Sequence, residues 1–105
     1  MPKTSSEPRE RDIRKELKKR VEAYGGEIRA VSWLGRRHAP DVLVLMPAEF
    51  PCANSANAHP FVETKAPGGK PNAGQAREHE RMRVAGCTVL VISTFKQLGN
   101  WWPPV

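Results

Sequence analysis

Residues 61–65 read FVETK, a strand-forming segment that carries a carboxylate and an ammonium group two positions apart. Side chains of a β-strand alternate between the two faces of a sheet, so Glu63 and Lys65 point to one face, and Val62 and Thr64 point to the other. If the first face is interior, burial of the two charges is costly unless they are paired or bind an ion. The segment therefore indicates either a surface ion pair or part of an active site.

The segments on both sides of FVETK predict an α/β fold. Apolar residues recur at helical spacing before Tyr24, and Gly25-Gly26 ends that run. The expected elements, in chain order, are a helix from the capping residue Ser6 to Tyr24, strands at 27–34, 42–46 and 59–65, a helix from the capping residue Asn72 to about residue 85, a strand at 87–92 and a helical turn at 94–98. This αβββαβ order predicts a mixed four-stranded sheet flanked by helices. Its first three strands form an antiparallel meander, and the last strand pairs parallel to a neighbour after a helical crossover.

Length and composition predict one small globular domain with a polyanionic partner. The chain has 105 residues, of which 39% are hydrophobic, a net charge of +6 and a pI near 9.8. We expect residues 1–105 to form a single domain with a flexible arm at 1–6 and a tail at 99–105. The positive charge favours nucleic acid as the partner, the alternative being solubility alone.

The cellular compartment also follows from composition. No segment has the length and apolar character of a membrane span, and the N-terminus does not resemble a signal peptide. The two cysteines, Cys52 and Cys87, are too few for a disulfide framework. We therefore expect a cytoplasmic protein with reduced cysteines.

Two further carboxylates are expected near the FVETK strand. Asp41 opens the apolar segment 42–46, which is typical of a central strand, and Glu10 falls on the N-terminal extension of the apolar stripe of the first helix. Carboxylates and the backbone carbonyl of Thr64 are hard oxygen ligands, the kind that Mg²⁺ or Mn²⁺ accepts. A neighbouring ammonium group, that of Lys65, can polarise the attacking water and offset charge on a phosphate. The set indicates hydrolysis of a phosphodiester.

Basic residues flank this set on both sides. Arg36 and Arg37 lie in the turn before Pro40-Asp41, and Lys70 lies in the Gly-rich turn that follows FVETK. Each of the three can contact the phosphate backbone of DNA, and each can also serve only to solubilise an exposed turn. We interpret them as candidate DNA-binding residues.

The ordered set of residues resembles the PD-(D/E)xK nuclease signature. Pro40-Asp41, an apolar strand and Glu63-Thr64-Lys65 match the signature itself, and the element order is similar to the restriction-endonuclease-like core that carries it. More narrowly, the chain resembles the VRR-NUC (virus-type replication-repair nuclease) domain in its stand-alone bacteriophage form. That resemblance covers residues 10–92 and includes Glu10, Gly25-Gly26, Trp33, Arg37, Gln75 and Gly86.

The resemblance implies a Mg²⁺- or Mn²⁺-dependent deoxyribonuclease that acts as a homodimer on branched DNA such as Holliday junctions. It implies that Asp41 and Glu63 are metal ligands and that Lys65 is the catalytic lysine. Glu10 would be a further ligand, directly or through water. Gln75 would orient Lys65, a water or a phosphate.

Two features depart from the family pattern. His38-Ala39 stands before Pro40, where a glycine and a small apolar residue are more usual, and the connection at 47–58 is long. These departures bear on substrate preference and dimer geometry more than on the metal site. The alternatives are a DNA-binding module of the same fold without catalysis, and a nuclease of another preference (nicking, flap or exonuclease).

Each candidate site residue also has a purely structural interpretation. Asp41 can stabilise a turn after proline, and Glu10 can be a first-turn carboxylate favoured by the helix dipole. Gln75 has capping-box spacing to Asn72. Glu63 can form an exposed ion pair with the lysine two positions on, which is a common arrangement.

The histidines and the C-terminal tryptophans have structural interpretations as well. No combination of His38, His59 and His79 with the cysteines has zinc-finger or zinc-ribbon spacing. His79 falls on the inner side of its helix, where packing explains it. Trp101 and Trp102 can stack on bases, or they can cover the core or a dimer partner.

Overall fold

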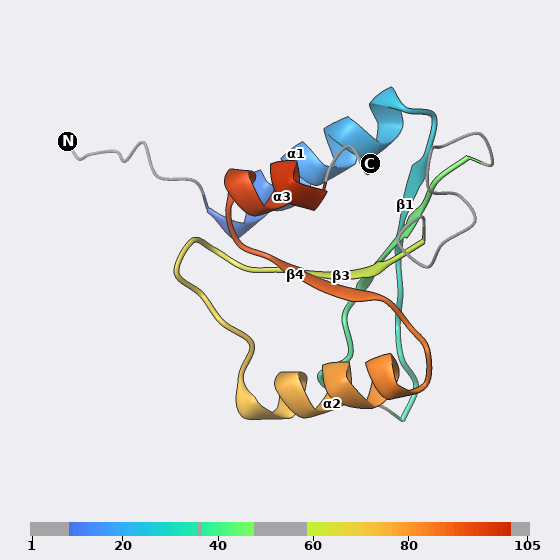
Figure 1. Cartoon of the computed structure of the whole chain (residues 1–105), viewed down its shortest axis with the longest axis vertical. Coiled ribbons are helices and arrows are strands. Elements are labelled where there is room, and N and C mark those ends of the chain that lie inside the picture. Colours follow the sequence, from blue (N-terminus) through green and yellow to red (C-terminus); the bar gives the residue numbers. More distant parts are fainter. Residues whose placement is uncertain (1–8, 36, 48–58, 102–105) are drawn as a thin grey trace.

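The computed structural model describes residues 9–35, 37–47 and 59–101, which form an α/β fold (Figure 1). Its elements, in chain order, are α1 (Glu10–Ala23), β1 (Glu27–Ala30), β2 (Val42–Leu45), β3 (Phe61–Thr64), α2 (Ala73–Val84), β4 (Val89–Ile92) and α3 (Phe95–Trp101). The predicted element order is confirmed. Arg36, Cys52, Trp102 and the arm at 1–6 lie outside the described residues.

The strands form one mixed sheet in the order β1-β2-β3-β4. β1 pairs antiparallel with β2, and β2 pairs antiparallel with β3. β4 returns parallel to β3 after the crossover through α2, with Glu63 aligned to Val91 and Thr64 to Ile92. The predicted meander and the predicted parallel last strand are both confirmed, because a helical crossover returns the chain in the same direction.

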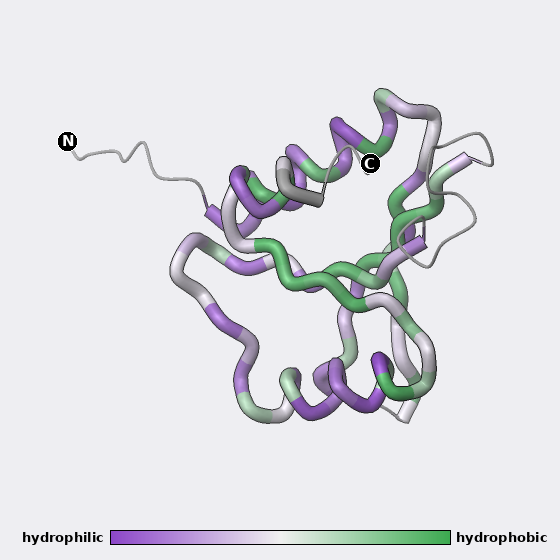
Figure 2. The backbone as a smooth tube through the Cα atoms, in the orientation of Figure 1, coloured by the Kyte–Doolittle hydropathy of each residue, from purple (hydrophilic) through white to green (hydrophobic). Residues whose placement is uncertain are grey.

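The sheet has a helix layer on each face. α1 and α3 lie together on one face, and α2 lies on the other (Figure 1). The apolar stripe of α1 and the apolar side chains of β2, β3 and β4 form the core, and Figure 2 shows the hydrophobic colouring concentrated on the strands. The core residues are Ile13, Leu17, Val21, Val42, Val44, Met46, Val62, Ile92 and Leu98.

The face of α2 that meets the sheet is more polar than that of α1. Its buried residues are Glu78, His79 and Met82, whereas those of α1 are all aliphatic. Buried polar groups need hydrogen-bond or charge partners. The buried polar side chains of α2 are therefore held in defined positions against the sheet. Glu63 belongs to the sheet face that this layer covers.

The strands β2, β3 and β4 are one or two residues shorter at an end than predicted, and three element boundaries differ by three residues or more. α1 begins at Glu10 after Arg9, whose N–H donates to the Asp12 carboxylate at 2.8 Å, so the helix does not begin at Ser6. β1 ends at Ala30, four residues before its predicted end, although the Val31 N–H still donates to the Asp41 carbonyl. α3 is a full helix, so Trp101 belongs to a helix and not to a tail.

The Gly25-Gly26 pair joins α1 to β1 as predicted. Gly25 has φ +86, a conformation that closes helices and suits glycine. At Gly26 a Cβ atom would lie 2.6 Å from the Leu45 carbonyl oxygen, so only glycine lets the chain pass this close to β2. Within the described ranges, no helix combines the length and the apolar character needed to span a membrane.

Candidate active site

Asp41 and Glu63 come together because β2 and β3 run antiparallel. The register pairs Val42 with Val62, and its continuation by one residue places Asp41 opposite Glu63. Asp41 and Glu10 both raise the pKa of Glu63, although burial is the larger cause. The three carboxylates therefore share one electrostatic environment at this end of the sheet.

The segment that carries Asp41 is held by two hydrogen bonds. The Val31 N–H donates to the Asp41 carbonyl at 2.9 Å. The Trp33 indole N–H donates to the Pro40 carbonyl at 2.7 Å. Trp33 also packs on Phe61 of β3, with ring centroids 5.4 Å apart. The aromatic residue before the Pro40-Asp41 pair thus ties that pair to the strand that leads to Glu63.

Glu63 is the most buried of the three carboxylates, with 11% of its side chain exposed. Its carboxylate oxygens lie 3.7 Å from Lys65 Nζ, 3.7 Å from His79 Nε2 and 3.5 Å from Gln75 Nε2. Burial raises the pKa of Glu63, Asp41 and Glu10 raise it further, and Lys65 and Arg14 oppose the rise. The negative charge of this carboxylate is therefore incompletely compensated by the surrounding residues.

The predicted alternation along FVETK is confirmed. Lys65 lies on the same face as Glu63, with 21% of its side chain exposed, so the pair is not an exposed surface ion pair. Thr64 points to the opposite face, is fully buried and reaches α1, where its hydroxyl donates to Glu10 at 3.4 Å. One strand end thus presents functional groups on both faces of the sheet.

The structure corrects the expected environment of Glu10. The apolar stripe of α1 does not extend to a buried position at Glu10, because the helix begins there and 49% of the side chain is exposed. The Glu10 carboxylate nevertheless contacts the end of β3, because it accepts a hydrogen bond from the Thr64 hydroxyl. Glu10 is therefore near the predicted set, at its solvent-facing side.

Arg14 is a residue of the site that the sequence interpretation missed. Its Nη2 lies 3.1 Å from Asp41 Oδ1 and 3.8 Å from Glu10 Oε2, and its Nε and Nη2 both donate to Thr64 Oγ1 at 3.3 Å. The spacing of four residues from Glu10 was a local signal for an ion pair. The contact with Asp41 has no such signal, because it joins residues far apart in the sequence.

Gln75 forms the predicted capping box and also contacts Glu63, while its role in orienting Lys65, a water or a phosphate stays a prediction. Its N–H donates to the Asn72 side chain at 2.8 Å, and its Oε1 accepts from the Asn72 N–H at 3.0 Å, which completes a capping box at the start of α2. The amide Nε2 remains free to donate to Glu63. The cap therefore holds the side chain that touches the buried carboxylate.

His79 is buried in α2, 1% exposed, as expected for a packed residue. Burial lowers the pKa of His79, and Arg83 and Lys65 lower it further, against the opposite effect of Glu78. The ring is therefore neutral at physiological pH. Its Nε2 has no hydrogen-bond partner among the described residues, and lies 3.7 Å from Glu63. The inner position of His79 was predicted, but its proximity to Glu63 was not.

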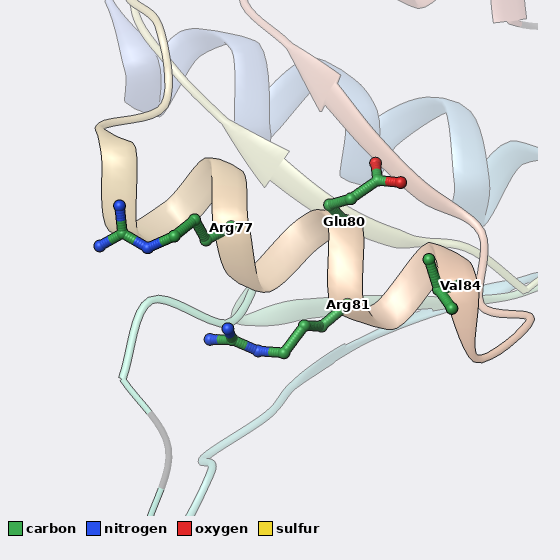
Figure 3. A pocket seen from close by; sticks show the side chains of 4 residues that line it. All are labelled: Arg77, Glu80, Arg81 and Val84. Atoms are coloured by element: carbon green, nitrogen blue, oxygen red, sulfur yellow. The ribbon is translucent and has the colours of Figure 1, made fainter.

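The candidate DNA-binding residues lie on exposed connections. Arg37, in the turn before Asp41, and Lys70, between β3 and α2, are both exposed. A separate shallow depression lies on α2, lined by Arg77, Glu80, Arg81 and Val84 (Figure 3). It includes none of the predicted site residues.

The donor set fits a hard divalent cation. Among the residues that the structure describes, no three His, Cys, Asp or Glu side chains are already arranged to hold a metal ion. Glu63, however, is a buried carboxylate with a raised pKa, and its contacts with described residues are 3.5 Å or longer. A positive charge placed between Glu63 and Asp41 would stabilise both carboxylates. Mg²⁺ commonly takes one or two protein carboxylates and completes its coordination with water.

Comparison with known proteins agrees with this geometry. No family model matches the chain. Over 86 residues it is 40% identical to the phage protein named "Putative nuclease p44", from Acyrthosiphon pisum secondary endosymbiont phage 1, an alignment that covers 82% of this chain and 84% of the relative. A solved structure titled "VRR_NUC domain" matches with a TM-score of 0.71 and 40% identity, over 87% of this chain and 90% of the other.

Fold, strand-end carboxylates and sequence identity together define a nuclease domain. The chain belongs to the VRR_NUC family, and the resemblance predicted from its sequence is confirmed. Both matches extend over most of the chain and most of the matched protein, so they cover the fold as a whole and not one short motif.

Proposed function

We propose that the protein is a Mg²⁺- or Mn²⁺-dependent DNA endonuclease that selects branched DNA, with the four-way junction as its preferred substrate. The observation that carries the proposal is the placement of Asp41 opposite the buried Glu63, with Lys65 on the same face and 3.7 Å from Glu63. Membership of a nuclease family supports hydrolysis of a phosphodiester. The net charge of +6 supports a polyanionic substrate.

In this proposal Asp41 and Glu63 hold the divalent ion, with Glu10 as a further ligand and the backbone carbonyl of Thr64 as an additional oxygen donor. When bound, the ion supplies electrostatic stabilisation of the charge that develops on the phosphate. Lys65 is the catalytic lysine, because its ammonium group lies beside a ligand carboxylate and can orient the attacking water.

Gln75 is a positioning residue in the same proposal. It donates to Glu63 from the first turn of α2, and its own orientation is set by the capping box with Asn72. Arg36, Arg37 and Lys70 contact the DNA backbone. Arg37 and Lys70 are exposed cations on connections that adjoin Asp41 and β3.

A homodimer suits this function. Resolution of a four-way junction needs two cuts related by symmetry, and a twofold dimer presents two identical sites. A second copy would also bury more surface for a chain of only 105 residues. The proposed active unit is therefore a dimer with one site in each protomer.

The test compares wild type with Asp41→Asn on a labelled four-way junction and on the matched linear duplex, with Mg²⁺, Mn²⁺ or EDTA. We expect symmetric nicking of the junction in either metal, no nicking in EDTA, and at least about a 100-fold loss of rate in Asp41→Asn. Glu27→Gln is the matched control, because it neutralises an exposed carboxylate of β1 that pairs with Arg29. It should cut like wild type.

Two results of this test would contradict the proposal in different ways. Binding of the junction without cutting in every metal would indicate a DNA-binding module of the same fold. Equal cutting of the linear duplex and the junction would retain the nuclease and remove its preference for branched DNA.

A further inference from the structure

The guanidinium group of Arg14 lies between two of the carboxylates that the proposed function assigns to the metal. A single nitrogen, Nη2, is 3.1 Å from Asp41 Oδ1 and 3.8 Å from Glu10 Oε2. Nε and Nη2 also donate to the buried hydroxyl of Thr64. One cation thus connects the start of α1, the segment before β2 and the end of β3.

The charge balance of the site changes when a divalent ion enters. Glu10, Asp41 and Glu63 carry three negative charges, and Arg14 and Lys65 carry two positive charges, so the site retains one net negative charge. Addition of a divalent ion with Arg14 in place would leave one net positive charge. If Arg14 withdraws, the ion and Lys65 balance the three carboxylates completely.

The contacts of Arg14 are of a kind that can be broken. The side chains of Arg14, Asp41 and Glu10 are 41%, 56% and 49% exposed, and exposed ion pairs are weak because water and salt screen them. The same carboxylate oxygens are hard ligands that a divalent cation prefers. Arg14 and the ion therefore compete for the same atoms.

We propose that Arg14 is an internal counter-cation that holds Asp41 and Glu10 in position in the metal-free protein and releases them when the divalent ion binds. The inference rests on the proposed function, since it takes these carboxylates as ligands. In this role Arg14 offsets the repulsion between the Asp41 and Glu10 carboxylates when no ion is present. It also weakens ion binding, because it competes with the ion for the same carboxylate oxygens.

The test measures Mn²⁺ binding by isothermal titration calorimetry, without DNA, for wild type, Arg14→Gln and Arg20→Gln. We expect Arg14→Gln to bind Mn²⁺ about fivefold more tightly, the factor expected when one exposed ion pair no longer has to be broken. Arg20→Gln is the matched control, because Arg20 pairs with Glu16 at 2.8 Å with the same four-residue spacing on α1. It should bind Mn²⁺ like wild type.

Thermal unfolding gives a second readout that a purely structural role would not produce. Arg14→Gln should melt at a lower temperature than wild type in EDTA and recover most of the difference in Mn²⁺. If the only role of Arg14 is its hydrogen bonds to Thr64, the variant should be destabilised equally in EDTA and in Mn²⁺. Arg14→Lys keeps the positive charge but loses the planar guanidinium group that contacts several oxygens at once. It should therefore bind Mn²⁺ with intermediate affinity. If Arg14→Gln does not fold, Arg14→Lys provides the test instead.

The outcomes separate this inference from the proposed function. Equal or weaker Mn²⁺ binding by the Arg14 variants, with clear binding by wild type, overturns the counter-cation role and leaves the metal site intact. Absence of Mn²⁺ binding in wild type and variants alike overturns both.

Discussion

Glu63 shows how burial changes the chemistry of a single side chain. It sits on a strand end covered by α2, with only 11% of its side chain exposed, while Asp41 and Glu10 add negative potential from the neighbouring segments. A carboxylate in this position is costly for the fold when it is ionised and useful for function when a cation compensates it. The same charge therefore opposes stability and favours ion binding.

This balance predicts the pH dependence of stability. The pKa of Glu63 is raised in the folded state above the value of 4.5 for the unfolded chain, so the folded state binds more protons between these two values. Stability should therefore fall as pH rises through this interval. Glu63→Gln removes the titration, so in EDTA it should melt above wild type at neutral pH and coincide with it below about pH 4.5.

Thermal unfolding across the pH range, with Glu27→Gln as the control, checks this prediction. The control changes the same atoms on an exposed side chain of β1 and should follow the wild-type curve. A lower melting temperature for Glu63→Gln than for wild type at neutral pH would mean that Lys65 and Arg14 more than offset the burial of Glu63.

At the scale of secondary-structure elements, the start of α2 is coupled to the site. Asn72 caps the helix, Gln75 completes the box, and the same Gln75 side chain donates to Glu63. A helix cap is a local device, but here it also sets the orientation of a side chain that contacts the buried carboxylate. In the proposed function, helix stability and the positioning of Glu63 therefore depend on the same two residues.

Loss of this cap should reduce both properties. Asn72→Ala should cost about 1 kcal/mol of stability, because the first turn of α2 loses a hydrogen-bond acceptor. It should also slow junction cleavage at least about threefold, because Gln75 is no longer held beside Glu63. The two effects are measured by denaturant unfolding and by cleavage at a temperature where both proteins are folded.

Thr94→Ala is the matched control for the cap of α2. Thr94 accepts the Gln97 N–H at 3.0 Å, and Gln97 accepts the N–H of Ser93, one residue before Thr94, at 2.7 Å, so α3 begins with a similar arrangement. This variant should lose similar stability and retain the wild-type rate. Equal rates for the two cap variants would show that the orientation of Gln75 does not matter for catalysis.

At the scale of the whole molecule, positive charge governs contact with DNA. The net charge of +6 attracts any polyanion, but only cations that neutralise phosphates contribute to the salt dependence of binding. Arg37 is exposed in the turn that leads to Asp41, whereas Lys18 is exposed on α1. Substitution of each residue in turn distinguishes a direct contact with a DNA phosphate from the effect of the net charge of the protein.

Arg37→Ala should weaken junction binding and reduce the slope of log affinity against log salt by about 1, because one phosphate contact is lost. Lys18→Ala removes the same charge from the molecule and should leave the slope unchanged. Fluorescence anisotropy in Ca²⁺, over a series of salt concentrations, measures both. Identical slopes for all three proteins would exclude a phosphate contact by Arg37.

The sequence by itself determined the order of elements, the antiparallel meander, the parallel direction of the last strand and the facial pairing of Glu63 with Lys65, whereas the strand beside β4 came from the structure. These are local properties, because the periods of 3.6 and 2 and the turn residues act over a few positions. The capping box of α2 and the glycine pair that ends α1 were also predictable, because each depends on residues a few positions apart. Even here, the end of β1 at Ala30 did not follow from the sequence pattern, which extended the strand to Leu34.

Only the tertiary structure decided which side chains from distant parts of the sequence meet around Asp41 and Glu63. Arg14 reaches Asp41 across 27 positions of the sequence, and His79 approaches Glu63 from the opposite helix layer. The exposure of Glu10 likewise depends on where α1 begins over the sheet. Such contacts arise when α1 and α2 pack on opposite faces of the sheet, and that packing depends on the summed burial of many side chains, not on any short pattern.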